Sequence, residues 1–195
     1  FCTGAGNDGS CAPSGIERIE SMTINGPSVQ TSGVDLFAEY QMEMGGGILN
    51  IGTDISHTME YEQDAYFKGG ILVGSAYDAA GFLNGGRSAR PLPDLKGRVY
   101  GEYNLGDHNF LLYANHITSY DDDRYAGVEV DAQTTYDFHY QLSFLQDAAR
   151  FTLSAINLSD EQPPAARLDL GYDGYTHNAF GRMIKLGLEY TLSDG

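Results

Sequence analysis

The sequence has no apolar run long enough to cross a membrane as an α-helix. A helical span needs about 20 consecutive apolar residues, whereas polar residues interrupt every apolar stretch here well before that length. A helical span in this sequence is therefore excluded. A β-barrel, whose strands carry alternating apolar and polar residues, is compatible with the pattern.

Basic residues are also scarce. Eleven Lys and Arg stand against 27 Asp and Glu, which gives a formal net charge of −16. A nucleic-acid-binding protein needs a basic stripe to contact phosphates, so we expect no nucleic-acid partner. The acidic residues are dispersed, apart from the run Asp121–Asp123, and do not form an acidic tail.

Tryptophan is absent, whereas the chain contains 25 Gly and 14 Tyr. This composition favours strands and turns over helices. The sequence opens at Phe1, without an initiator Met, a basic n-region or an apolar signal segment. We therefore expect a processed protein or a piece of a longer one.

The chain has two cysteines, Cys2 and Cys11, in a segment of Gly, Asn, Asp, Ser and Pro. A disulfide between them would close this segment into a small loop and imply an oxidising compartment. Two free thiols or a metal-binding pair are the alternatives, and the metal interpretation lacks a second ligand pair nearby. We favour the disulfide.

Apolar and polar residues alternate along most of the chain. From Glu129 to Phe144 the even-numbered residues are mostly apolar and the odd-numbered residues are polar. This alternation predicts one sixteen-residue strand with an apolar face and a polar face. Similar alternation predicts six more strands, over residues 34–44, 49–60, 95–105, 110–120, 151–158 and 184–192.

The predicted connections alternate in length. Short turns are expected at 45–47, 106–108 and 146–149, and long polar loops at about 62–91, 121–127 and 159–181. A soluble sandwich gives no reason for this alternation, whereas an outer-membrane barrel has short periplasmic turns and long extracellular loops. A sixteen-residue strand at about 3.4 Å per residue also reaches roughly 54 Å, beyond a hydrocarbon core of ~30 Å. We therefore predict an all-β protein that forms a transmembrane antiparallel β-barrel.

Several segments resemble one protein family. The stretch INLSDEQPP, residues 156–164, resembles the Asn-Leu-Phe-Asp-x-x-Pro-Pro signature of TonB-dependent outer-membrane receptors, with Ser159 in place of Phe. Residues 172–182 (YDGYTHNAFGR) and 184–192 (IKLGLEYTL) are similar to the entry to the last strand of those receptors and to that strand. Residues 23–40 and 98–123 are similar to upstream strands, so the resemblance covers nearly the whole chain.

The resemblance implies that residues 1–195 are the C-terminal portion of a receptor. They would supply the last seven or so strands of a barrel of roughly 22. The plug domain and the earlier strands would lie outside this sequence, and residues 1–15 would form a Cys-bearing extracellular loop. The location would be the outer membrane of a Gram-negative bacterium.

The function implied by the resemblance is active uptake of a scarce ligand such as a siderophore, cobalamin, oligosaccharide or peptide. No cofactor, metal or enzymatic activity is expected. The partners would be outer-membrane lipid and lipopolysaccharide, the TonB complex through the plug domain, the transported ligand, and a surface lipoprotein as a further candidate. A passive porin or channel and a soluble β-sandwich binding module are the alternatives.

Candidate ligand contacts lie in the long loops and the upper lumen, where aromatic faces and charges gather. These candidates are Tyr66, Phe67, Arg87, Arg90, Tyr120, Arg124, Tyr125, Tyr172, Tyr175 and His177. The polar faces of the strands supply residues predicted to face the lumen or plug: Asp54, Arg98, Glu102, Asp131 and His139. Hydration of the lumen and ion pairs with a plug are the simpler interpretation of this second set.

Overall fold

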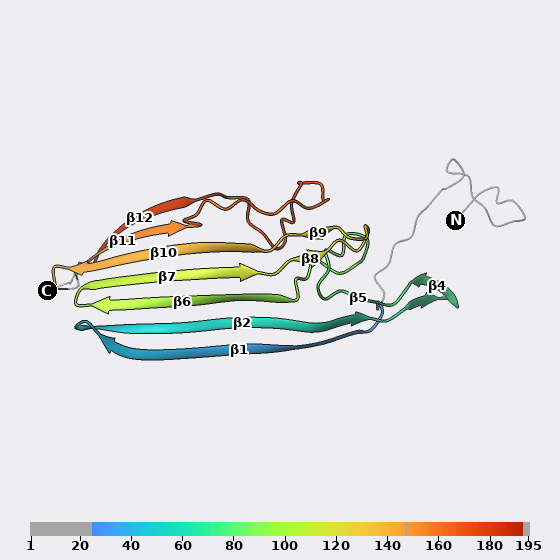
Figure 1. Ribbon diagram of the computed structural model, residues 1–195, viewed down its shortest axis with the longest axis horizontal. Helices are drawn as coiled ribbons and strands as arrows, with labels where there is room; N and C mark the ends of the chain where they lie inside the picture. The colour runs from blue at the N-terminus through green and yellow to red at the C-terminus, as the bar shows by residue number, and fades with distance from the viewer. Residues whose placement is uncertain (1–24, 147, 193–195) are drawn as a thin grey trace, which may run out of the picture.

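The computed structural model of the protein describes residues 25–146 and 148–192. Within these ranges all regular structure is β-strand, and no helix is long and apolar enough to cross a membrane. Seven long strands form one antiparallel sheet in chain order (Figure 1). Their bounds are β1 Val29–Met44, β2 Gly47–Gln63, β6 Leu95–Leu105, β7 His108–Ile117, β10 Gln133–Phe144, β11 Ala149–Ile156 and β12 Met183–Tyr190. The prediction of an all-β antiparallel fold is confirmed.

The sheet is open in the described residues, because β1 and β12 form its two edges and do not pair with each other. Five short strands lie in the connections. Their bounds are β3 Tyr66–Lys68, β4 Ile71–Gly74, β5 Tyr77–Asp78, β8 Tyr120–Asp121 and β9 Glu129–Val130. Strands β3 and β4 pair with each other, as do β8 and β9, and β5 pairs with the end of β2.

Short turns and long loops alternate along the chain and lie at opposite ends of the sheet (Figure 1). The turns β1–β2, β6–β7 and β10–β11 are at one end, and the connections β2–β6, β7–β10 and β11–β12 are at the other. Gly45 and Gly46 have positive φ angles of 59° and 85°, a conformation that glycine adopts without steric cost.

The prediction of one continuous strand from Glu129 to Phe144 is wrong, because the structure divides this segment into two strands. Residues 129–130 pair with β8 in the loop region, and β10 begins only at Gln133. The physical reason is the side chain of Val130, which is 1% exposed and packs with Leu83 and Tyr120 rather than continuing the sheet face. The strands that reach sixteen residues or more are instead β1 and β2, with 16 and 17.

The pairing register places the apolar faces of the seven strands on one side of the sheet. Phe138 of β10, for example, lies opposite Leu112 of β7 and Ala155 of β11. Large side chains on this face are exposed: Val34, Leu36, Tyr40, Ile51, Val99, Leu112, Ile184, Leu186 and Leu188. No second sheet packs on this face in the described part of the chain. A sandwich interior is therefore absent from residues 25–146 and 148–192.

The packed core of the described residues lies among the long loops instead of against the sheet. Leu83 from the β2–β6 connection meets Tyr120 and Val130 from the β7–β10 connection, and all three side chains are at most 2% exposed. Ala166 and Leu168 of the β11–β12 connection pack against them. We call this assembly of the three connections, residues 64–94, 118–132 and 157–182, the loop cluster.

Candidate functional site

A buried polar network holds the loop cluster together. The hydroxyl of Tyr120 donates to Oδ2 of Asp173 at 2.7 Å and lies 3.1 Å from Nε2 of His177. Nδ1 of His177 is 2.8 Å from Oε1 of Gln133, whose Nε2 donates to the carbonyl of Gln162 at 3.2 Å. These groups come from separate parts of the chain, so the network fixes the β7–β10 and β11–β12 connections relative to each other.

The network places two of the predicted ligand contacts in the interior. Tyr120 is 2% exposed and His177 is 5% exposed, so their side chains belong to the scaffold of the loop cluster. Burial raises the pKa of the Tyr120 hydroxyl, and its hydrogen bond to Asp173 raises it further. Sequence reasoning missed Asp173 and Gln133, although Asp173 lies in the segment that resembles the entry to the last strand of the family.

Mild acid is expected to loosen the loop cluster through His177. Burial lowers the pKa of His177, and the attraction of Asp173 only partly opposes this. His177 is buried in its neutral form, so it binds a proton more weakly in the folded loop cluster than in the opened loops. Its stabilisation of the loop cluster is therefore present above about pH 6.5 and is lost as the pH falls below that value. Hydrogen exchange corrected for intrinsic rates should show weaker loop protection at pH 5 than at pH 7.5.

The matched variant for this pH experiment is His177→Gln. It removes the titrating ring, so we expect loops that exchange faster than wild type but that respond little to pH over the same range. An unchanged pH response in His177→Gln would show that another group is responsible.

Two arginines anchor the acidic run at residues 121–123. Arg124 donates from Nε and Nη2 to the two carboxylate oxygens of Asp122, at 3.0 and 3.1 Å. These hydrogen bonds hold the pKa of the Asp122 carboxyl below its usual range. The guanidinium carbon of Arg87 lies over the rings of Tyr77 and Phe82, 4.9 Å from each centroid. The Nε of Arg87 is 3.5 Å from Oδ2 of Asp123. Arg87 therefore ties the β2–β6 connection to the β7–β10 connection.

A hollow of about 490 Å³ opens between the three connections. It is lined by Gly85, Arg124, Arg167, Leu168, Asp169, Leu170, Tyr172, Gly174 and Tyr175. Three predicted ligand contacts, Arg124, Tyr172 and Tyr175, meet here, while Arg167 was missed because an isolated Arg carries no signal in the sequence. Volumes of about 300–1,000 Å³ suit small ligands or parts of larger ones.

The other predicted ligand contacts are distributed around this hollow or away from it. Arg90 lies over the ring of Tyr175 at 4.8 Å. The guanidinium carbons of Arg124 and Arg167 lie over the ring of Tyr125, 5.5 and 4.5 Å from its centroid. Tyr66 and Phe67 lie on the separate β3–β4 hairpin, where Phe67 is 59% exposed.

Four of the five residues predicted to face the lumen or plug share the polar face of the sheet. They are Asp54, Arg98, Glu102 and His139. Asp54 and Arg98 form an exposed ion pair of 3.4 Å, while His139 Nδ1 lies 2.9 Å from Oγ of Ser154. The prediction for Asp131 needs correction, because it lies in the break between β9 and β10 and not on a strand. The break follows from the burial of Val130 in the loop cluster.

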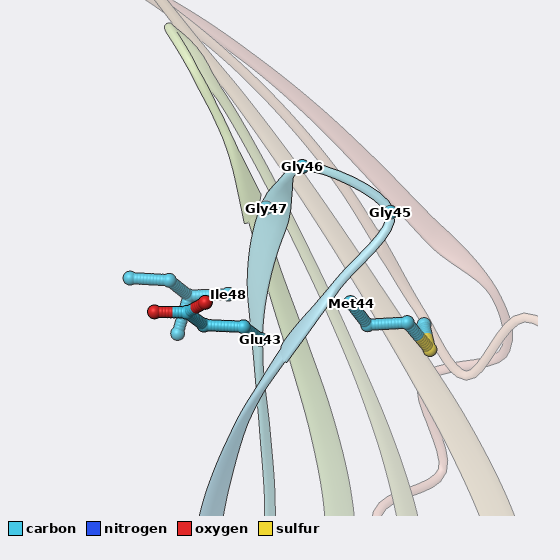
Figure 2. A pocket seen from close by; sticks show the side chains of 6 residues that line it. All are labelled: Glu43, Met44, Gly45, Gly46, Gly47 and Ile48. Atoms are coloured by element: carbon cyan, nitrogen blue, oxygen red, sulfur yellow. The ribbon is translucent and has the colours of Figure 1, made fainter.

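A second hollow, of about 440 Å³, lies at the β1–β2 turn (Figure 2). Figure 2 shows the side chains of Glu43 and Ile48 on one side of the hairpin and Met44 on the other. This agrees with the register, in which Glu43 is opposite Ile48. Residues 43–48 alone line this hollow, so it brings together no side chains from distant parts of the chain.

A comparison with protein-family models, curated proteins and solved structures finds no match to this chain. Among the residues that the structure describes, no group of three His, Cys, Asp or Glu side chains is placed to hold a metal ion. Cys2 and Cys11, with the loop predicted over residues 1–15, lie outside the described residues.

Proposed function

We propose that this chain forms the C-terminal part of the barrel of a TonB-dependent outer-membrane receptor, which takes up a scarce ligand without reacting with it. The observation that carries the proposal is the exposed apolar face shared by all seven long strands. Leu186 and Leu188 are 71% and 75% exposed on this face. Exposed apolar patches beyond a few hundred Å² are rare on soluble monomers, whereas lipid is a natural solvent for such a face.

The connections support the same proposal. A barrel in the outer membrane has short turns on its periplasmic side and long loops on the cell surface, and here the two kinds lie at opposite ends of the sheet. Strand β1 has 16 residues, which at about 3.4 Å per residue exceeds the hydrocarbon core of ~30 Å even with a tilt. The long strands would therefore carry the loop cluster above the membrane.

The sheet edges also fit a larger barrel. Strands β1 and β12 each leave one row of backbone groups without a strand partner in the described residues. Such rows are unsatisfied in lipid and promote aggregation in water. Neighbouring barrel strands would pair with both edges, and the polar face that carries Asp54 and Arg98 would then line the lumen and meet the plug domain.

In this proposal the chain supplies wall, lumen lining and surface loops, and the TonB complex drives uptake through the plug. Outer-membrane lipid and lipopolysaccharide would contact the apolar face, and a surface lipoprotein would dock on the loops. A passive porin would share the wall but would need no energy. Collapse of the inner-membrane proton gradient should therefore stop uptake by the receptor and leave a porin unaffected.

Single cysteines should test which end of the sheet faces the medium. Phe180→Cys in the β11–β12 connection, where the native side chain is 70% exposed, should react with a membrane-impermeant maleimide in intact cells. Asp107→Cys in the β6–β7 turn should react only after the outer membrane is opened. Labelling is read by mass spectrometry, with the unsubstituted protein as the background for Cys2 and Cys11.

Equal labelling of Phe180→Cys and Asp107→Cys in intact cells would contradict the proposed topology. A soluble monomer without detergent would contradict the membrane location as well, and would favour the β-sandwich binding module.

A further inference from the structure

We infer that the hollow of the loop cluster binds a six-membered ring that carries a carboxylate. This rests on the proposed function, since the hollow meets an external ligand only if the loop cluster lies at the cell surface. The inference deepens that function by naming a ligand class.

Positive charge gathers in the loop cluster of an otherwise acidic protein. Six of the eleven Lys and Arg lie in the three connections of the loop cluster: Lys68, Arg87, Arg90, Arg124, Arg167 and Arg182. Arg87 and Arg124 have carboxylate partners, Asp123 and Asp122. Arg90 and Arg167 form no ion pair with any described residue and lie over the rings of Tyr175 and Tyr125. Their charges are therefore available to an anion at this end of the sheet.

The loop cluster holds the guanidinium group of Arg124 and the backbone of Arg167 in place. Arg124 is held by both oxygens of Asp122, and its Nη2 also donates to the backbone carbonyl of Arg167 at 2.6 Å. A Cβ atom added at Gly85 would lie 2.6 Å from Cζ of Arg124. Glycine at this position allows the guanidinium to approach the backbone. The hydrogen bond from Arg124 holds the backbone of Arg167, whose guanidinium carbon lies over the Tyr125 ring at 4.5 Å from the centroid.

The lining of the hollow combines aromatic and apolar surfaces with charged groups. The rings of Tyr172 and Tyr175, with Leu168 and Leu170, offer flat or apolar contact for a ring. The planar guanidinium of Arg167 matches a carboxylate in a two-pronged hydrogen-bonding geometry. Asp169 lies in the same lining and would repel a doubly charged phosphate more strongly than a singly charged carboxylate. Asp169 also offers acceptors for ring hydroxyls.

Two ligand sources share this chemistry, namely acidic sugars and aromatic carboxylates. Trigalacturonate tests the first, with its neutral counterpart galactotriose. The aromatic arm uses 2,3-dihydroxybenzoate, with catechol as the matched compound that lacks the carboxylate. Binding of each compound to the purified intact protein in detergent is measured by titration calorimetry.

The decisive variant is Arg167→Gln, which removes the charge at an exposed position. We expect its affinity for the charged probe that binds wild type to fall about tenfold or more, because hydrogen bonds between charged groups are lost. The control is Arg150→Gln, an exposed arginine in β11 beside the β10–β11 turn, at the opposite end of the sheet. This control should bind as wild type does.

A second variant keeps the test valid if Arg167→Gln fails to fold. A Cβ at Gly174 would lie 3.4 Å from Leu170 Cδ1 and 3.7 Å from Cε2 of Tyr172, which are ordinary contact distances. The Cβ of a leucine therefore fits at this position in Gly174→Leu, and the rest of its side chain would occupy part of the hollow. Gly174→Leu should weaken binding as strongly as Arg167→Gln.

The inference is supported if one charged probe binds the wild-type protein and if Arg167→Gln or Gly174→Leu weakens that binding. The probe that binds identifies the ligand source as an acidic sugar or an aromatic carboxylate. The inference is overturned if neither charged probe binds, if the neutral counterparts bind equally well, or if both variants bind as Arg150→Gln does. Cysteine labelling in cells separates this result from the proposed function. A receptor with correct topology that binds neither probe would disprove the ligand class alone.

Discussion

Replacing Leu112 by Arg should prevent assembly of the protein into the outer membrane, whereas Leu111→Arg should leave assembly intact. The two leucines are neighbours near the middle of β7 and lie on opposite faces of the sheet. Leu112 lies opposite Gly101 and Phe138 on the apolar face and is 47% exposed. In the proposed barrel this face contacts lipid, where an Arg near the bilayer midplane costs about 2–4 kcal/mol.

Leu111 provides a matched control because the native residue and the substitution are the same. Its partners across the ladder are Glu102 and His139, on the polar face. An Arg at position 111 would lie beside the Glu102 carboxylate and in contact with water, so the added charge is tolerated. The measurement is the amount of folded protein in outer-membrane fractions, followed by its resistance to unfolding in cold detergent. Similar assembly of the two variants would show that the apolar face does not contact lipid.

Replacing Asp173 by Ala should open the loop cluster while leaving the sheet folded. The Asp173 side chain is fully buried and accepts hydrogen bonds from the Tyr120 hydroxyl at 2.7 Å and from the backbone N–H of Tyr175 at 2.9 Å. Each hydrogen bond to a carboxylate contributes about 1.5–3 kcal/mol, so the loss should be about 3 kcal/mol or more in the opening free energy of the loops. The Tyr120 hydroxyl would also lose its acceptor in a buried position.

The control for Asp173→Ala is Asp169→Ala, in the same connection but with an exposed side chain. Native-state hydrogen exchange measures both effects separately. Amides of the loop cluster should lose protection in Asp173→Ala, those of β6 and β7 should keep it, and Asp169→Ala should resemble wild type. If Asp173→Ala retained full loop protection, the buried network would not be what stabilises the connections.

The alternation of residues in the sequence predicted the strands well because it is a local property. Strand β6 begins and ends at the predicted residues, Leu95 and Leu105. Because a strand is pleated, successive side chains lie on opposite faces of the sheet. The sequence therefore predicted that Val99 lies on the apolar face and Arg98 on the polar face. The pairing of Asp54 with Arg98 did not follow from the sequence, because register depends on which residues of the partner strand lie opposite.

The candidate site was harder to predict, because residue type indicates chemistry but not burial. Tyr120 and His177 were chosen as aromatic loop residues, and the structure places both in the interior with Asp173. Arg124 was chosen for its charge and Tyr172 for its aromatic face in the loops, and both line the hollow. Loop polarity gave no means of separating these two outcomes, because polar residues satisfied by buried partners look the same in a sequence as polar residues facing solvent.

The sequence by itself determined where the seven long strands lie, apart from the break at residues 131–132, which face of each long strand is apolar, and that short turns alternate with long loops. Neighbouring residues carry all of this information. Only the tertiary structure decided that the three long connections pack around Leu83, Tyr120 and Val130, and that Arg124 meets Arg167 beside a hollow. These contacts join segments far apart in the chain, and their free energy exists only once the sheet has brought the loops to one end.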